Sequence, residues 1–266
     1  MLASEPAIRF AVFAGVLAAM LAWEQIAPRR VPAPNRLARR LNNAGLLIIG
    51  TLALRAAVPV LAVAAAMWAQ AQGLGLFNLI ALPALFSVPA SLILLDLAIY
   101  GQHRLFHAVP LLWRLHRVHH ADPDFDVTTA LRFHPLEIIA SMGFKLVLVI
   151  ALGAPPLAVL IFEILLNALA MFNHANIALP AGVDRALRRI IVTPDLHRVH
   201  HSVLAAEQRH NFGFNLSLWD RWFGTLQAQP QAGHIAMQIG QPQWRDARAQ
   251  RVDQLLLQPF KSTNRI

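Results

Sequence analysis

Long apolar segments alternate with shorter polar ones along this chain. The apolar segments are 7–27, 43–70, 79–100, 135–153 and 155–173. A bilayer has a hydrocarbon core about 30 Å thick, which roughly 20 helical residues can cross. The pattern therefore predicts about four to five transmembrane helices, of which the last two form a hairpin broken at Gly153-Ala-Pro155-Pro156.

The composition supports this interpretation. Hydrophobic residues make up 56% of the 266 positions, charged residues only 14%, and the mean hydropathy is +0.48. This is too apolar for an ordinary soluble domain. No segment resembles a linker, so we expect one all-α structural unit embedded in the membrane.

The chain has a net charge of +9, and its arginines cluster next to the apolar segments. Residues 28–40 contain five arginines and no acid (Arg29, Arg30, Arg36, Arg39 and Arg40). By the positive-inside rule this loop is predicted to be cytoplasmic. Arginines next to apolar segments favour anionic lipid headgroups, so we expect no nucleic-acid partner.

The pentapeptide His-Arg-Val-His-His occurs twice, at 116–120 and at 197–201. Its histidines stand at i, i+3 and i+4, so three imidazoles can converge on one point from one helical face. His103 and His107 form a further i, i+4 pair. Imidazole is a good ligand for several transition metals, and these eight histidines are enough for two ions. The chain has no cysteine, which excludes thiolate zinc sites and cysteine-ligated iron–sulfur clusters.

The third apolar segment is predicted to continue past the membrane as a helix that carries ligands. Asp96, Tyr100, His103 and His107 fall at i, i+4, i+7 and i+11, on one helical stripe. Asp96 or Tyr100 could orient a ligand imidazole through a hydrogen bond. Tyr100 could equally be an aromatic anchor at the membrane interface.

The remaining histidines stand singly. His174 ends the last apolar segment and is predicted to be a ligand, and His134 is predicted to neighbour the site. We interpret His234 as structural, and His210 as structural with a supporting role as the alternative. Thr193-Pro194-Asp195 is typical of a helix start and precedes the second pentapeptide.

The predicted spans bring three histidine-containing stretches that are separated in the sequence to one membrane face. We therefore expect a cytoplasmic histidine-rich helical cap. Asp122, Asp124 and Asp126 follow the first pentapeptide. They lack the downstream glycine and glutamate of an EF-hand calcium loop, and we interpret them as a solvated loop.

The order HxxxH, HxxHH and a distant HxxHH among membrane spans resembles the fatty acid hydroxylase / sterol desaturase superfamily. The resemblance covers about residues 90–226. It includes Asp96-x-x-x-Tyr100-x-x-His103, His134-Pro135-Leu136-Glu137, Asn173-His174-Ala175-Asn176, Thr193-Pro194-Asp195-Leu196-His197 and Trp219-Asp220-Arg221-Trp222-Phe223-Gly224-Thr225. It implies a catalytic domain at 79–226. The apolar pattern and the composition predict N-terminal spans at 1–78, which carry no such signature, and a basic polar tail at 227–266.

The resemblance implies a membrane non-haem enzyme with two iron ions. Such enzymes use O₂ to attack an unactivated C–H bond of a lipid (a sterol, a fatty acyl chain or a related molecule), giving an alcohol or a double bond. The implied ligands are His103, His107, His116, His119, His120, His174, His197, His200 and His201. Some family members have a second histidine four residues after the counterpart of His174, where this chain has Ala178. Either one ligand fewer is used or another group fills the place.

Residues that could support the ligands are Asp96, Tyr100, His134, Asn211 and Asp220. The chain has no recognisable haem, flavin, nicotinamide or iron–sulfur motif, so we expect a separate electron-donor protein or reductase. The absence of a retention signal at Asn264-Arg265-Ile266 favours a bacterial inner membrane.

Several alternatives stay open. The same ligand set suits ether-lipid cleavage, carotenoid hydroxylation or sterol oxidation. A structural zinc site without oxidative activity is the main alternative, because imidazole also suits zinc. A metal transporter would place its ligands near the midplane of the membrane, which this pattern does not.

Overall fold

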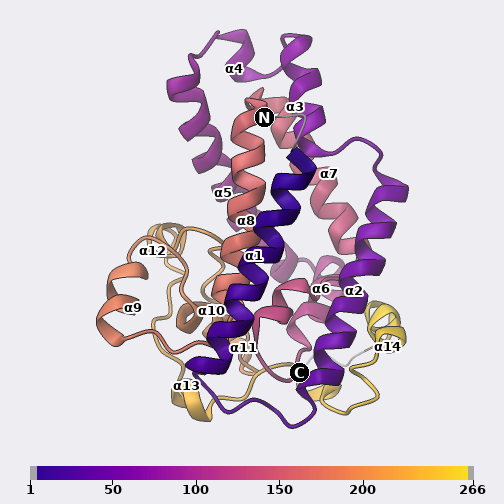
Figure 1. The fold of residues 1–266 in the computed structure, drawn as a ribbon, viewed down its shortest axis with the longest axis vertical. Coiled ribbons are helices and arrows are strands. Elements are labelled where there is room, and N and C mark those ends of the chain that lie inside the picture. Colours follow the sequence, from indigo (N-terminus) through magenta and orange to yellow (C-terminus); the bar gives the residue numbers. More distant parts are fainter. Residues whose placement is uncertain (1–4, 263–266) are drawn as a thin grey trace.

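The structure is a computed structural model that describes residues 5–262. Over this range the chain forms α-helices and short 3-10 turns, with isolated β-bridges but no strand. Figure 1 shows long helices running side by side, with most of the short helices gathered at one end and α4 at the other. The predicted all-α class is confirmed.

Five segments are long and apolar enough to cross a membrane, which confirms the predicted integral membrane protein. They are α1 (Glu5–Ile26), the stretch Arg36–Leu79 that holds α2 (Arg36–Ala57), α3 (Ala62–Ala71) and α4 (Leu76–Leu79), α5 (Ala84–Ala108), α7 (Pro135–Leu152) and α8 (Pro156–His174).

The second span differs from the prediction of one helix over 43–70. Helix α2 ends at Ala57, and α3 starts only at Ala62. Pro59 explains the break, because proline disfavours helical backbone in the residue before it and donates no amide hydrogen bond. Val58 is accordingly extended, with φ −129°. The offset allows α3 to pack against α7 and α8.

The end of the bundle away from the short helices is closed by two turns packed backbone to backbone. Gly75 precedes α4 with φ 92°, and Gly153 joins α7 to α8 with φ 63°. A Cβ atom at Gly75 would lie 2.3 Å from the carbonyl oxygen of Ile150. Only glycine fits there, since it has both the left-handed backbone and no side chain.

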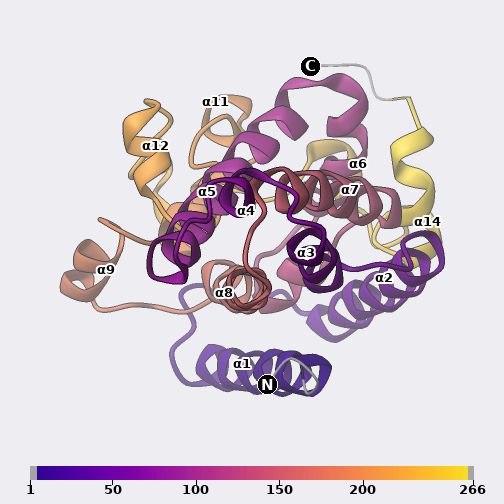
Figure 2. The same ribbon diagram turned by 90° about the horizontal axis from the view of Figure 1, so that it is seen from above.

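The short helices form a cap at the opposite end of the bundle (Figure 1). They are α6 (Pro110–His120), η2 (Val127–Leu131), α9 (Ala181–Leu187), α10 (Pro194–His200), α11 (Ala205–Gln208), α12 (Leu218–Trp222), α13 (Gly233–Ala236), η3 (Pro242–Trp244), α14 (Val252–Leu257) and η4 (Gln258–Phe260). Figure 2 shows α1 on the outside of the bundle, where it packs against α8.

A buried ion-pair network ties the membrane helices to the cap. Arg39 of α2 contacts Asp122 at 2.7 Å and also pairs with Asp126, and all three side chains are buried. Asn43 donates a further hydrogen bond to Asp122. The prediction of a solvated loop is therefore wrong for Asp122 and Asp126, because they neutralise a buried guanidinium. Arg39 is likewise unavailable to lipid headgroups.

We predict that Arg39→Met strongly destabilises the protein. It leaves buried carboxylates without their main counter-charge, which typically costs about 3–5 kcal/mol. The thermal unfolding midpoint in detergent measures this. Arg36→Met, one turn earlier on α2 at a partly exposed position, is the control and should change little.

The same network predicts a pH dependence. Burial alone would raise the pKa of Asp126, but Arg39 and Arg40 outweigh burial and hold it below its ordinary value. A lowered folded pKa gives stability that is present at neutral pH and is lost as the pH falls through that pKa. The unfolding midpoint of the wild type should fall below about pH 4, and Arg39→Met should flatten this fall. An equal acid dependence in both proteins would contradict the assignment.

Candidate metal centre

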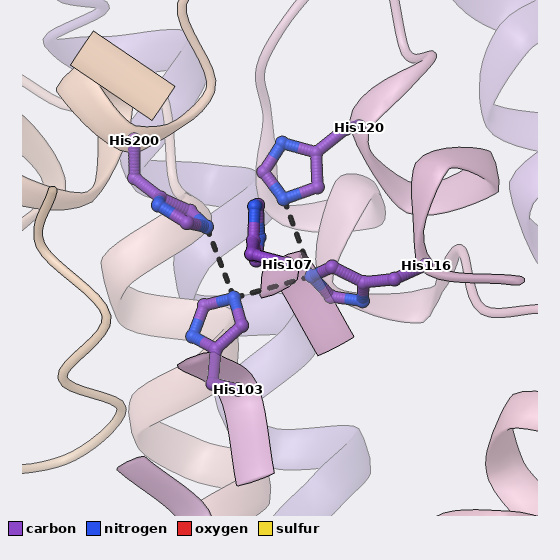
Figure 3. A group of neighbouring side chains, drawn as sticks. All are labelled: His103, His107, His116, His120 and His200. Carbon is purple, nitrogen blue, oxygen red and sulfur yellow. Dashed lines mark hydrogen bonds between the residues drawn. The ribbon is translucent and has the colours of Figure 1, made fainter. Parts of the chain in front are cut away.

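The first histidine group gathers side chains from three elements at the junction of bundle and cap (Figure 3). It consists of His103 and His107 from α5, His116 and His120 from α6, and His200 from α10. One nitrogen or more of each lies within 4.8 Å of the others. Four are buried and His107 is partly buried.

The second histidine group adjoins the first. It consists of His119 from α6, His174 from α8, and His197 and His201 from α10 and its end. All four are buried. The rings of His120 and His201 stack with centroids 4.4 Å apart, so the two groups are neighbours. Four nitrogens here against five in the first group agree with one ligand fewer after His174.

Each pentapeptide divides its histidines between the two groups, contrary to the expectation that all three converge on one point. His116 and His120 enter the first group, and His119 enters the second. In the other copy His197 and His201 enter the second group, and His200 enters the first. Helix geometry explains this, because i and i+4 differ by about 40° around the axis while i+3 lies about 60° to the other side.

The start of α10 confirms the predicted helix boundary but not the way it is stabilised. Thr193 precedes Pro194 as expected, yet its side chain makes no capping hydrogen bond. Asp195 instead contacts Arg29 at 3.1 Å and pairs with the buried Arg198. The loop before α2 is thus anchored to the helix that carries His197 and His200 and is followed directly by His201.

Hydrogen bonds on the outer side of the rings fix the tautomer of several histidines. Nδ1 of His103 donates to the backbone oxygen of Phe212 at 2.9 Å, and Nδ1 of His200 donates to that of His210 at 2.8 Å. Nδ1 of His174 donates to Ala170 at 2.7 Å. A neutral imidazole carries one proton, so in each of these rings Nε2 presents a lone pair to the centre of its group.

The inward nitrogens therefore need a cation. Nε2 of His103 and Nε2 of His200 are 3.0 Å apart, yet neither carries a proton to donate. Two nitrogens bound at right angles about 2.1 Å from one metal ion would be about 3.0 Å apart. Nε2 of His107 and Nε2 of His201 are buried without any hydrogen-bond partner. The residues present thus fit one metal ion in each group.

Burial keeps several imidazoles of the cap uncharged. Burial lowers the pKa of His200 to about 3. Burial, followed by the neighbouring His201, holds the pKa of His120 well below its ordinary value, and burial followed by His174 does the same for His119. Neutral imidazole is the form that binds metal, so these side chains need no deprotonation step at neutral pH.

Glu137 supports the site, although the sequence alone gave it no role beyond its place in a motif. Its Oε1 accepts a hydrogen bond from Nδ1 of His116 at 2.6 Å, and both side chains are buried. A carboxylate behind a ligand imidazole fixes its orientation and raises its basicity. The available signal was an acid in the first turn of a strongly apolar helix, a position that is costly without a partner.

Asp220 supports His103 through the backbone. Its two oxygens accept hydrogen bonds from the amides of Phe212 and Gly213, each at 2.8 Å. The same Phe212 offers its carbonyl to His103. A Cβ atom at Gly213 would lie 2.7 Å from Asp220, so this turn requires glycine.

The other predicted supporting residues brace the cap without touching a ligand ring through their side chains. Asp96 accepts from Nε1 of Trp219 at 2.8 Å, and the hydroxyl of Tyr100 contacts Thr225 at 2.8 Å. Asn211 has a left-handed backbone with φ 57° and donates to Leu196 at 2.9 Å. They hold the segment that follows the second pentapeptide against α5 and α10.

Three histidines lie outside both groups. His134 caps α7 by accepting from the amide of Leu136, and its Nε2 contacts the carbonyl of Leu256. His210 contributes only its backbone oxygen, to His200. His234 is buried 3.6 Å from Asp195, in keeping with a structural role.

A cavity of about 290 Å³ inside the helix bundle opens onto the first group. His103 and His116 line it, and most of its wall is apolar. Helices α1 and α2 contribute Phe13, Leu47 and Leu54 to this wall. His103 and His116 are thus reachable from the apolar interior of the bundle.

We predict that Glu137→Ala weakens metal binding at the first group by about 10- to 100-fold, as is typical for loss of a partner behind a ligand. Competition with a chelator measures the affinity. His134→Ala is the control, since it removes a helix cap three residues away and should lower stability without changing metal affinity. Equal affinities in the two variants would contradict the role of Glu137.

Comparison with known proteins identifies the family. The family model described as fatty acid hydroxylase matches residues 88–225, about half of the chain, and this range contains all nine histidines of the two groups. No solved structure matches the chain.

Three relatives illustrate the range of similarity. Ornithine lipid hydroxylase OlsE of Rhizobium tropici is 32% identical over 56% of this chain and 44% of its own length. Human alkylglycerol monooxygenase is 35% identical over 50% of this chain and 29% of its own length. Rat cholesterol 25-hydroxylase is 26% identical over 54% and 48%, so the chain matches less than half the length of each relative. By the extent of the family match, the chain belongs to the fatty acid hydroxylase family.

Proposed function

We propose that this protein is an O₂-dependent lipid hydroxylase in which each histidine group holds one iron ion. The observation that carries the proposal is the pair of adjoining groups, with five and four ligand nitrogens, at the end of an apolar cavity between membrane helices. The three relatives, named as hydroxylases or monooxygenases, favour hydroxylation over desaturation.

The proposed reaction replaces one C–H bond of a lipid by C–OH. One atom of O₂ becomes the hydroxyl oxygen, and the other leaves as water after uptake of two protons and two electrons. Iron bound by imidazole supplies the one-electron and O₂ chemistry. The electrons come from a separate donor protein.

The chain's own contribution is positioning and exclusion of water. Fixed tautomers at His103, His200 and His174 aim their Nε2 lone pairs at the two sites before any ion arrives. The cavity offers the lipid an apolar channel that ends at His103 and His116. A C–H bond held there is in place for reaction, so little orientational freedom has to be lost during the reaction itself.

The proposal also includes the domain organisation of the chain. Residues 79–226 carry the catalytic groups, residues 1–78 form N-terminal spans, and residues 227–266 are a tail. The five arginines of 28–40 support a cytoplasmic cap, as in a bacterial inner membrane protein. A cytoplasmic position would give a soluble electron donor access to the cap.

A structural zinc site is the second candidate. It is favoured by the ligand type alone, because four imidazoles suit tetrahedral zinc and the second group has four. The first group argues against it. Five nitrogens exceed the four ligands of a structural zinc site, and the end of a cavity is an open position.

The metal content of protein purified in detergent tests the proposal. We expect about two iron ions per chain, with Mössbauer parameters of a coupled pair after growth on labelled iron. His200→Ala and His119→Ala should each reduce the iron content, because each removes a nitrogen from one group. His234→Ala, a buried histidine outside both groups, is the matched control and should retain the iron. Zinc alone, with no iron after anaerobic reconstitution, would favour the structural site.

Isotope incorporation tests the reaction itself. With a reductase system and a lipid extract under ¹⁸O₂, we expect wild-type protein to yield lipid products that carry one labelled oxygen atom. His119→Ala should yield less than about one hundredth of this product, because the second group loses a ligand. Full activity of His119→Ala, or unlabelled products, would contradict the proposed reaction.

A further inference from the structure

Helix α7 carries a polar stripe of which the proposed chemistry uses only the first residue, Glu137. Glu137, Ser141 and Lys145 stand at i, i+4 and i+8, and all three line the cavity. Ser141 and Lys145 lie in the part of the helix that would be surrounded by hydrocarbon. Glu137 supports His116, so the stripe leads from the first histidine group into the membrane interior.

Lys145 is held at the far end of this stripe by charges from two other helices. Its ammonium group contacts Glu163 of α8 at 2.7 Å, and Glu163 also lies 2.9 Å from Arg9 of α1. Arg9 contacts Glu5 at 2.7 Å. These two cations and two anions balance, so the cluster has no net charge to offer an ionic ligand.

Such a cluster is expensive to keep inside a membrane. Ionisable groups in transmembrane helices are rare and are typically functional, while a buried ion pair is weak evidence for stability. The ammonium group of lysine has three donors, and the contact with Glu163 accounts for one of them. Because Lys145 lines the cavity, its other donors can reach a bound molecule.

Gln102 gives an independent sign of a ligand. Its amide nitrogen donates to Ser141 at 2.7 Å, while its Oε1 is buried without any hydrogen-bond partner. The side chain lines the same cavity and only 9% of the residue is exposed. A buried acceptor of this kind is costly unless a donor reaches it, and an O–H group of a ligand is such a donor.

We propose that the polar stripe between Gln102 and Lys145 binds a neutral hydroxyl group of the lipid substrate. The hydroxyl can accept from Lys145 or donate to Gln102, and being uncharged it leaves the balanced cluster undisturbed. Ser141 and Lys145 follow Glu137 by four and eight residues of α7, a rise of roughly 6 and 12 Å. The inference rests on the proposed function, and it selects substrates that are oxidised roughly 6 to 12 Å from an existing hydroxyl.

Ligand binding to purified protein tests this inference without catalysis. The probes are dodecanol, dodecane and dodecanoate, and affinities follow from the rise of the unfolding temperature with ligand concentration. Hydrogen bonds to a charged donor predict that dodecanol binds wild type about tenfold or more tightly than dodecane. Lys145→Met should remove most of this preference and leave the affinity for dodecane unchanged. It also leaves the contact between Arg9 and Glu163 in place.

Two further variants keep the test decisive. Gln102→Leu removes the unpaired acceptor and should also weaken dodecanol binding, which protects the test if Lys145→Met folds poorly. Val147→Met, on the exposed face of the same helix, is the matched control and should retain the preference. Unchanged preference for dodecanol in both cavity variants would overturn the proposal. Tighter binding of dodecanoate than of dodecanol would overturn the choice of a neutral group.

The outcome separates this inference from the proposed function. Alcohol binding that depends on Lys145, in protein that holds no iron and incorporates no ¹⁸O, would support the hydroxyl site and reject the hydroxylase. Incorporation of ¹⁸O with no effect of Lys145 or Gln102 on binding would do the reverse.

Discussion

Unprotonated imidazole nitrogens that face one another across about 3 Å are the constraint on which the rest of the structure depends. His103 and His200 illustrate it. In each ring Nδ1 donates its proton to a backbone carbonyl, so that the Nε2 lone pair faces the other ring. Such a cluster is stable only around a cation. The outer hydrogen bonds, the buried Glu137 and the dense cap all act to hold these lone pairs in place.

The membrane helices and the cap meet this constraint together. Helices α5 and α8 bring His103, His107 and His174 down from the bundle, while α6 and α10 supply the pentapeptides. Buried ion pairs such as Arg39 with Asp122 fix the two parts relative to each other. Polar side chains at this junction therefore connect the bundle to the cap. Because some of the arginines near the membrane take part in these ion pairs, fewer of them can contact lipid headgroups than the sequence indicates.

The cavity connects the shared family chemistry to parts of the chain outside the family match. The match begins at residue 88, yet Phe13 of α1 and Leu47 and Leu54 of α2 line the cavity. The histidine groups thus belong to the common region, whereas one side of the cavity is built by the N-terminal spans.

The sequence by itself determined the helical class, the five apolar segments and the spacing of the histidines within each helix, because these depend on composition and on periodicity along a single helix. The choice of nine histidines as one set came from the resemblance to the family. Tertiary structure alone decided that each pentapeptide splits between two groups, that Asp122 and Asp126 are buried against Arg39, and that Glu137 lies behind His116. It also decided that Lys145, Gln102 and Ser141 share one cavity. These are contacts between helices distant in sequence, and no local periodicity specifies which partner a buried polar group will meet.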